Sequence, residues 1–164
     1  LEEKYEAYQY YLDAVKRDGV PYDLITKALP TIEGEVNNIL SQLVDFQMLF
    51  EMDGKNINNY IVYDDDNVWP LELSSGMERF ISSLAIRVAL INVSNLPRSN
   101  FLAIDEGWGT MDSDNLNSVY SLFQYLKSQF QFTLIVSHID SMRDAVDTLL
   151  EIKKEKDYSN IMFD

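Results

Sequence analysis

The sequence contains no cysteine among its 164 residues and a single histidine, His138. The absence of cysteine excludes a disulfide framework, thiolate metal sites and a cysteine nucleophile. It also favours a reducing compartment, so that cytoplasm, nucleoid and nucleus all fit. Long apolar runs are missing too, since stretches such as Phe132–Val136 fall far short of the ~20 residues that cross a bilayer. We therefore expect a soluble protein with no membrane partner.

Positive charge is scarce. Lys and Arg number 13 against 27 Asp and Glu, which gives a formal net charge of −14. Long-range steering of a polyanion is therefore unfavourable, and any contact with DNA needs a local basic patch or another chain. What the sequence does have is 46% hydrophobic residues in a length that suits one domain with a core.

An apolar seam runs along the first residues in alternating steps of four and three, at Leu1, Tyr5, Tyr8, Leu12 and Val15. This is the a/d spacing with which a helix packs against a partner helix. We expect the end of a coiled coil over residues 1–20, although an amphipathic surface helix explains the visible heptads equally well. Gly19 and Pro21 should end this helix, and residues 21–164 should form one lobe. The start at Leu1, inside a helical pattern, suggests a segment of a longer protein.

Two helices and a hairpin are expected next. The first helix should reach Leu29, and the second should enter through Pro30. Residues 46–52 and 59–64 are rich in large apolar side chains and flank a turn that contains Gly54. This pattern predicts a β-hairpin.

The segment Leu73–Ala89, LSSGMERFISSLAIRVA, joins a small-residue turn to an apolar helix. Ser75 and Glu78 have the S-x-x-E spacing of a capping box, which by itself is the simplest explanation of the turn. From Leu84 the helix is apolar nearly all round and should be buried on several sides. Arg87 then needs a partner or a route to solvent.

Two further apolar segments predict neighbouring parallel strands. Residues 101–104 read as a strand buried on both faces, which ends in Asp105-Glu106. After a helix over about residues 114–128, a second strand over residues 132–136 leads to His138. This order favours parallel pairing, so that both strand ends lie at one sheet edge, where open α/β sheets bind ligands. A short helix and two strands should close the chain, over residues 140–145, 148–153 and 159–163.

The groups at these strand ends suit phosphoanhydride hydrolysis. Asp105 can hold Mg²⁺ through its water shell while Glu106 polarises the attacking water; alternatively, the two carboxylates only cap a turn. His138 is either a structural hydrogen-bonding residue or a catalytic group at the same edge. The acidic run at residues 64–66, in contrast, reads as a solvated loop, because three consecutive carboxylates cannot all face one cation.

Four separated motifs resemble those of the ABC-type ATPase superfamily. LSSGM at 73–77 is similar to the LSGGQ signature, FLAIDE at 101–106 to Walker B, GTMD at 109–112 to the D-loop, and SH at 137–138 to the switch histidine. Within the superfamily, DEGWGTMD is similar to the DEGFGTLD of SbcC-type double-strand-break repair ATPases. ERFISSLAIRVAL resembles their signature helix, including Arg87, whereas structural-maintenance-of-chromosomes (SMC) proteins usually read DEVDAALD at the D-loop. The resemblance covers the chain from about Leu29 onward.

The sequence departs from the family pattern at the signature and in one absence. Ser75 stands where Gly is usual and Met77 where Gln or Glu is usual, which makes Glu78 a candidate to replace that side chain. No glycine is followed by Lys-Ser or Lys-Thr in the frame of a Walker A loop, G-x-x-x-x-G-K-[ST]. The chain alone should therefore not bind ATP in the ordinary way. SbcC-type proteins place Walker A in an N-terminal segment, before the coiled coil, which explains the absence.

The resemblance implies an α/β fold, the C-terminal lobe of an ABC-type P-loop ATPase head. That lobe has a largely parallel sheet flanked by helices, with the end of a coiled coil at its N-terminus. ATP and Mg²⁺ are the implied cofactors. The implied site comprises Glu106 and His138 as catalytic residues, Asp105 at the metal, and Ser74, Ser75, Gly76 and Asp112 at the nucleotide.

The implied function is ATP hydrolysis by a DNA repair and recombination ATPase that dimerises around ATP and controls a nuclease at DNA ends. Its implied partners are the N-terminal Walker A lobe of the same protein, a second copy of the head, a nuclease subunit and DNA. Two alternatives stay open: an SMC-like chromosome-organising ATPase head, and a non-catalytic structural module of the same fold. A transporter is disfavoured, because transporters normally keep Walker A and signature in one continuous domain.

Overall fold

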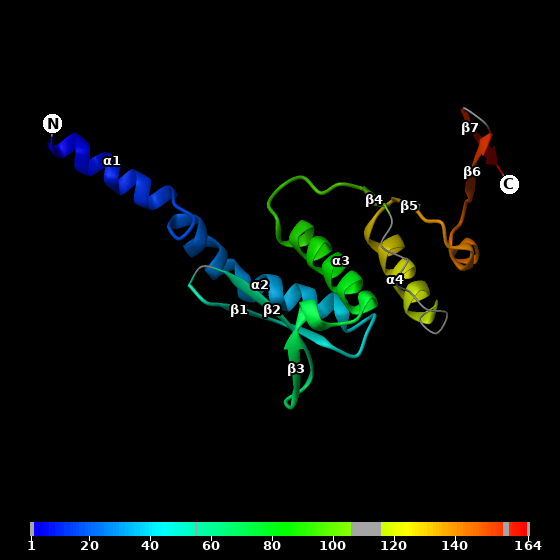
Figure 1. Ribbon diagram of the computed structural model, residues 1–164, viewed down its shortest axis with the longest axis horizontal. Coiled ribbons are helices and arrows are strands. Elements are labelled where there is room, and N and C mark those ends of the chain that lie inside the picture. Colours follow the sequence, from blue (N-terminus) through cyan, green and yellow to red (C-terminus); the bar gives the residue numbers. More distant parts are fainter. Residues whose placement is uncertain (1, 55, 106–115, 156–157, 164) are drawn as a thin grey trace. The chain divides into compact units, whose positions relative to one another are not determined.

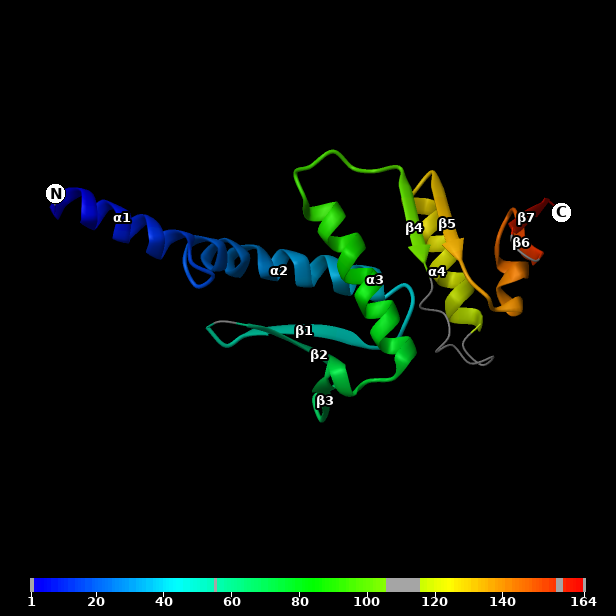
Figure 2. The same ribbon diagram turned by 45° about the horizontal axis from the view of Figure 1, so that its top comes forward.

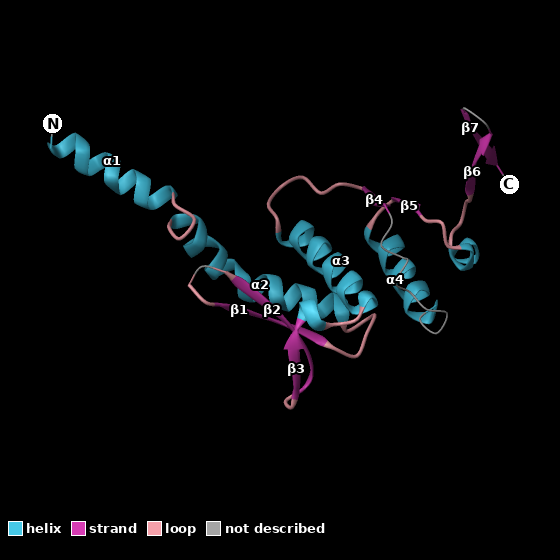
Figure 3. Ribbon diagram, in the orientation of Figure 1, coloured by secondary structure: helices cyan, strands magenta, loops and turns pink. Residues whose placement is uncertain are grey.

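A computed structural model describes residues 2–54, 56–105, 116–155 and 158–163 of the chain (Figure 1). It contains two compact units, Leu1–Arg98 and Ser99–Asp164, and each is described by itself. Both units combine helices and strands (Figure 3), which confirms the α/β class. Every helix among the described residues is too short or too polar to span a bilayer.

The first unit begins with helix α1 (Glu2–Val15), in which no residue is buried. The apolar seam predicted for a coiled coil is therefore open to solvent, with Tyr5 and Tyr8 exposed by 66% and 68%. Gly19 separates α1 from the next helix. A Cβ atom on Gly19 would collide with the main-chain oxygen of Asp13, so this connection has room only for glycine.

A single helix, α2 (Val20–Leu40), replaces the two helices expected from the sequence. Pro30 lies inside it, although a proline there removes a main-chain hydrogen bond and costs roughly 3 kcal/mol. The helix continues because it buries one apolar face, at about 1.5–3 kcal/mol per side chain. The buried residues of this face are Leu29, Val36, Ile39 and Leu40.

Strands β1 (Gln47–Met52) and β2 (Ile57–Asp64) pair antiparallel, which confirms the predicted hairpin. A third strand, β3 (Asn67–Pro70), pairs with β2 and was not predicted, because its four residues hardly stand out after the acidic run. Asp64 ends β2 and accepts hydrogen bonds from Asn67 Nδ2 at 2.7 Å and from the Asp66 N–H at 3.0 Å. These bonds lower the pKa of the Asp64 carboxyl.

Helix α2 covers the free edge of β1 (Figure 2). The Asn37 side chain accepts from the Met48 N–H at 2.7 Å and donates to the Met48 carbonyl oxygen at 2.9 Å. One turn earlier, Glu33 Oε2 accepts from the Phe50 N–H at 2.8 Å. The edge strand is thus paired with side chains instead of being open to another chain.

A short 3₁₀ turn, η1 (Leu71–Leu73), leads into helix α3 (Gly76–Val93). The buried face of α3 includes Ile81, Leu84, Ala85, Val88 and Ala89. The prediction of burial on several sides is confirmed only in part, because Leu90 is 47% exposed. Arg87 is exposed and so reaches solvent. Asn92 Nδ2 donates to Glu35 Oε1 at 2.7 Å and joins α3 to α2.

In the second unit, β4 (Phe101–Asp105) and β5 (Phe132–Val136) pair in parallel, as predicted. The remaining elements are α4 (Leu116–Gln129), η4 (Asp140–Ala145) and the antiparallel pair β6 (Leu150–Glu155) and β7 (Tyr158–Phe163). The expectation of a largely parallel sheet is wrong for the described strands, because parallel pairing is confined to β4 and β5 and the other pairs are antiparallel.

The prediction that the 101–104 strand is buried on both faces is wrong for this unit. Ile104 is 8% exposed, but Phe101 is 48% exposed and Phe132 is 58% exposed. The two phenylalanine rings stack on the open face of the β4–β5 pair, with their centroids 5.5 Å apart. Burial alternates along the strands because α4 packs on one face, and the described residues of this unit leave the other face open.

Candidate functional site

The segment 73–78, here called the signature turn, runs from the last residue of η1 into the first turn of α3. Ser74 is 8% exposed, and its Oγ donates to the Leu71 carbonyl oxygen at 2.7 Å. Ser75 precedes the helix in an extended conformation, and Gly76 is the first helical residue. The buried Ser74 is therefore bonded to η1, whereas Ser75 is exposed.

The capping box predicted from Ser75 and Glu78 is present in both directions. The Glu78 N–H donates to Ser75 Oγ at 3.2 Å, and the Ser75 N–H donates to Glu78 Oε2 at 2.5 Å. The Arg79 N–H donates to the Ser75 carbonyl oxygen. The N–H groups of Gly76 and Met77 then donate to no other described residue, so they are the unpaired donors at the N-terminus of α3.

Tyr63 holds the other carboxylate oxygen of this cap. Its hydroxyl donates to Glu78 Oε1 at 2.6 Å. The Tyr63 ring lies between Phe46, at 5.6 Å, and Trp69, at 5.5 Å. No local pattern in the sequence indicates this contact, because Tyr63 lies on a strand 15 residues before Glu78.

The cap shifts the pKa of both partners. Partial burial would raise the pKa of the Glu78 carboxyl, but hydrogen bonds from Tyr63 and Ser75 outweigh burial and lower it. Burial and the bond to the carboxylate raise the pKa of Tyr63 to about 12. Glu78 is therefore ionised and Tyr63 neutral at neutral pH. Because both Glu78 oxygens are engaged within the chain, the idea that Glu78 replaces the side chain missing at Met77 is disfavoured.

Asp105 and His138 lie near one edge of the β4–β5 pair. Asp105 is the last residue of β4 and is aligned with Val136, the last residue of β5. His138 follows Val136 by two residues, and both Asp105 and His138 are exposed. The expectation that the two strand ends share an edge is confirmed. Glu106 and Asp112 lie outside the described residues.

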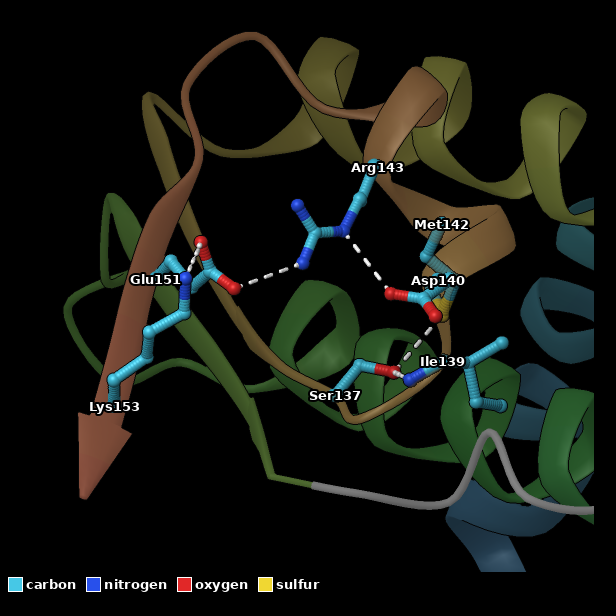
Figure 4. Close-up of polar contacts among 7 residues, drawn as sticks. All are labelled: Ser137, Ile139, Asp140, Met142, Arg143, Glu151 and Lys153. Atoms are coloured by element: carbon cyan, nitrogen blue, oxygen red, sulfur yellow. Dashed lines mark hydrogen bonds and ion pairs between the residues drawn. The ribbon is translucent and has the colours of Figure 1, made fainter. Parts of the chain in front are cut away.

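Ser137, the residue before His138, makes two hydrogen bonds through its hydroxyl (Figure 4). Ser137 Oγ accepts from the Ile139 N–H at 3.1 Å and donates to the sulfur of Met142 at 3.3 Å. Met142 is 7% exposed and anchors η4. The Ser137–Ile139 bond spans His138 and the Ser137–Met142 bond joins the loop to η4, while His138 itself is exposed.

Arg143 links η4 to strand β6. Its Nε donates to Asp140 Oδ1 at 3.1 Å, and one Nη donates to Glu151 Oε1 at 3.3 Å (Figure 4). Lys153 lies 3.5 Å from the other oxygen of Glu151. These pairs are exposed and contribute little stability singly, but together they connect the histidine loop to the terminal hairpin.

Asp105 offers a carboxylate at a strand end, the kind of oxygen ligand that Mg²⁺ uses with water and phosphate oxygens. Among the described residues, no group of three or more metal-ligating side chains is present. The Asp105 carboxylate by itself is of a kind that fits a magnesium ion.

The sequence relatives include a viral protein and bacterial nuclease subunits, and no family model matches the chain. It is 36% identical over 171 residues to the uncharacterized protein R555 of Acanthamoeba polyphaga mimivirus, a match that covers 94% of this chain and 13% of R555. It is 33% identical over 82 residues to the SbcC subunit of the SbcCD nuclease of Rhodobacter capsulatus, covering 49% of this chain and 7% of that protein. For the SbcC subunit of Staphylococcus aureus the identity is 30% over 93 residues, covering 54% and 9%. The chain spans a small part of each relative.

The solved structures similar to this chain include SMC heads. One, from work on ATP-driven dimerization and DNA-stimulated activation of SMC ATPases, has a TM-score of 0.70 at 15% identity and covers 86% of this chain and 88% of that chain. The SMC head domain from Thermotoga maritima has a TM-score of 0.59 at 23% identity, covering 86% and 50%. This chain folds like the C-terminal lobe of an SMC head.

A head bound to the C-winged helix domain of ScpA shares the fold as well, with a TM-score of 0.66 at 18% identity over 86% of this chain and 45% of that one. Together with the SbcC relatives from the SbcCD nuclease, these matches confirm the resemblance to SMC- and SbcC-like ATPase heads.

Proposed function

We propose that this lobe is the C-terminal half of an ATP-hydrolysing DNA repair ATPase head that dimerises around ATP and controls a nuclease at DNA ends. The observation that carries the proposal is the combination of an SMC-like fold with a capped signature turn and a β4–β5 edge ending in Asp105. The Walker A loop comes from the N-terminal lobe of the same protein, and DNA contact comes from the assembled complex.

The residues at the β4–β5 edge act on the nucleotide of their own head. Asp105 holds water on Mg²⁺, which when bound neutralises charge on the phosphates. Glu106 accepts a proton from the attacking water. His138 lies on the loop after β5 and donates a hydrogen bond toward the terminal phosphate. Asp112 belongs to the D-loop and contacts the nucleotide.

The signature turn acts on the nucleotide of the other head. Ser74, Ser75 and Gly76 lie at the N-terminus of α3, where the unpaired N–H groups and the helix dipole favour an anion. A γ-phosphate held by a second head would therefore join two heads, and its hydrolysis would release them.

Two observations favour the repair type over the chromosome-organising type. The named bacterial sequence relatives are subunits of the SbcCD nuclease, and the segment at residues 105–112 reads DEGWGTMD. The SMC-like alternative has support from the matching structures, which are SMC heads. In that alternative ATP controls a structural ring and no nuclease is involved.

The catalytic proposal is tested by combining this chain with the Walker A lobe of the same protein. We expect ATP turnover and an ATP-dependent dimer, measured by phosphate release and light scattering. Glu106→Gln should lower turnover by at least about 100-fold, the scale of a lost general base, and keep the dimer. Glu51→Gln, at an exposed strand position, is the matched control. Unchanged turnover in the Glu106 variant would make the catalytic assignment wrong.

Absence of any ATP-dependent dimer in that mixture would favour the non-catalytic structural module. The nuclease partner is tested separately, by pulldown of the corresponding nuclease with the intact coiled-coil base that includes α1. Retention of the nuclease supports the repair type. Loss of the interaction, with dimerisation intact, would favour the chromosome-organising type.

A further inference from the structure

Tyr63 connects the antiparallel sheet to the signature turn. Its hydroxyl holds one oxygen of Glu78 at 2.6 Å, and the other oxygen of Glu78 holds the Ser75 N–H at 2.5 Å. We propose that Tyr63 is a positioning residue that keeps the signature turn in the conformation that meets a phosphate. The inference rests on the proposed function, because the phosphate contact belongs to it.

Two aromatic side chains contact the ring of Tyr63, which is 43% exposed. Phe46 and Trp69 pack against it at 5.6 Å and 5.5 Å, one from the loop before β1 and one from β3. A tyrosine has few side-chain torsions, so these two ring contacts reduce the freedom of its hydroxyl. The hydroxyl is thereby presented to Glu78 at low entropic cost.

The sheet that carries Tyr63 is itself tied to helix α2. Asn37 and Glu33 bond the main chain of β1, β1 pairs with β2 along its whole length, and Tyr63 lies near the end of β2. Tyr63 itself lies at an irregularity of β2, between Val62 and Asp64, where it is aligned with no residue of β1 or β3. Hydrogen bonds therefore connect α2 to the sheet, and the ring contacts with Phe46 and Trp69 connect Tyr63 to it.

The contact exceeds what is needed to begin a helix. Ser75 Oγ and Glu78 already cap α3 without Tyr63. What Tyr63 adds is a fixed position for the Glu78 carboxylate, and hence for the turn between Ser74 and Gly76. Order present before two heads meet lowers the conformational entropy lost when they associate, so Tyr63 should matter more for association than for stability.

The experiment compares Tyr63→Phe with Tyr60→Phe in the full-length protein. Tyr60 lies on the same strand, and its hydroxyl bonds no described residue. Hydrogen exchange of residues 74–79 reports the order of the turn, and ATP-dependent dimerisation reports its use. For Tyr63→Phe we expect exchange and the dimer dissociation constant both to rise about fivefold, the scale of one lost hydrogen bond. Thermal stability should fall only slightly, because Ser75 and Glu78 still cap the helix. Nucleotide binding by the single head should stay unchanged, as should every readout of Tyr60→Phe.

Each result decides a separate point. Unchanged exchange in Tyr63→Phe overturns the positioning role, whatever happens to the dimer. Faster exchange with an unchanged dimer shows that the turn's order is not used in association, which also overturns the proposal. A wild-type protein that forms no ATP-dependent dimer overturns the proposed function, while the exchange data still decide whether Tyr63 orders the turn.

Discussion

The side-chain amide of Asn37 forms two hydrogen bonds with the main chain of Met48, accepting at 2.7 Å and donating at 2.9 Å. A side chain on α2 thus takes the place of a neighbouring strand for β1. We predict that Asn37→Ala destabilises the first unit by about 2–3 kcal/mol, because it leaves two half-buried main-chain groups unpaired. Chemical denaturation of the intact protein measures the loss.

The neighbouring Asn38 is the matched control for this prediction. Its main-chain oxygen, which accepts from Ser41 and Gln42, survives substitution. Asn38→Ala should change the free energy of unfolding by less than about 0.5 kcal/mol. Equal losses in the two variants would mean that the bonds to Met48 do not contribute beyond an average surface position.

A second prediction concerns two glycines near α2. A Cβ atom on Gly19 would collide with the main-chain oxygens of Asp13 and Ala14, whereas a Cβ on Gly34 meets nothing within 4 Å. Gly19→Ala should therefore force α1 to change direction, which faster proteolysis between α1 and α2 would reveal. Gly34→Ala, inside a helix, should raise stability by about 0.5–1 kcal/mol. The prediction fails if the two substitutions behave alike.

Local signals in the sequence predicted most elements of both units. The capping box at Ser75, the hairpin around Gly54 and the parallel strands before Asp105 and His138 all follow from short-range rules of spacing and turn chemistry. The prediction of two helices that meet at Pro30 was wrong, because the sequence does not show how much apolar surface a helix buries before and after a proline.

Contacts between distant segments were beyond sequence reasoning. Tyr63 looks like any aromatic strand residue, and only the packing of β3 against β2 brings Trp69 beside its ring. The same holds for the Asn37 bonds, since an asparagine in a helix carries no sign of the strand it will pair with. The roles of Glu106 and Asp112 stay predictions that the experiments above address.

A third prediction concerns the dependence of stability on pH. The pKa of Glu78 is lowered in the folded chain, so its hydrogen bonds stabilise the fold above its unfolded pKa and are lost as pH falls through the folded one. Glu78→Gln should therefore lower stability at pH 7 by about 0.5–1 kcal/mol, a modest value because solvent screens the group, and should have little effect near pH 3. Unfolding curves at both pH values measure this. A loss of equal size at both would show that charge on Glu78 is not involved.

The last prediction separates the two roles of Ser75, as helix cap and as a contact for phosphate. Aspartate is as good a cap as serine, because its carboxylate can accept from the Glu78 N–H that Ser75 Oγ now accepts from. Ser75→Asp should then unfold within a few degrees of wild type. Its negative charge would face the γ-phosphate of a second head, so ATP-dependent dimerisation should fall at least about tenfold through like-charge repulsion. Ser75→Asn, a neutral cap of the same size, should dimerise far better than the aspartate variant. Equal dimerisation by the two would place the phosphate away from Ser75 and remove the signature turn from the proposed site.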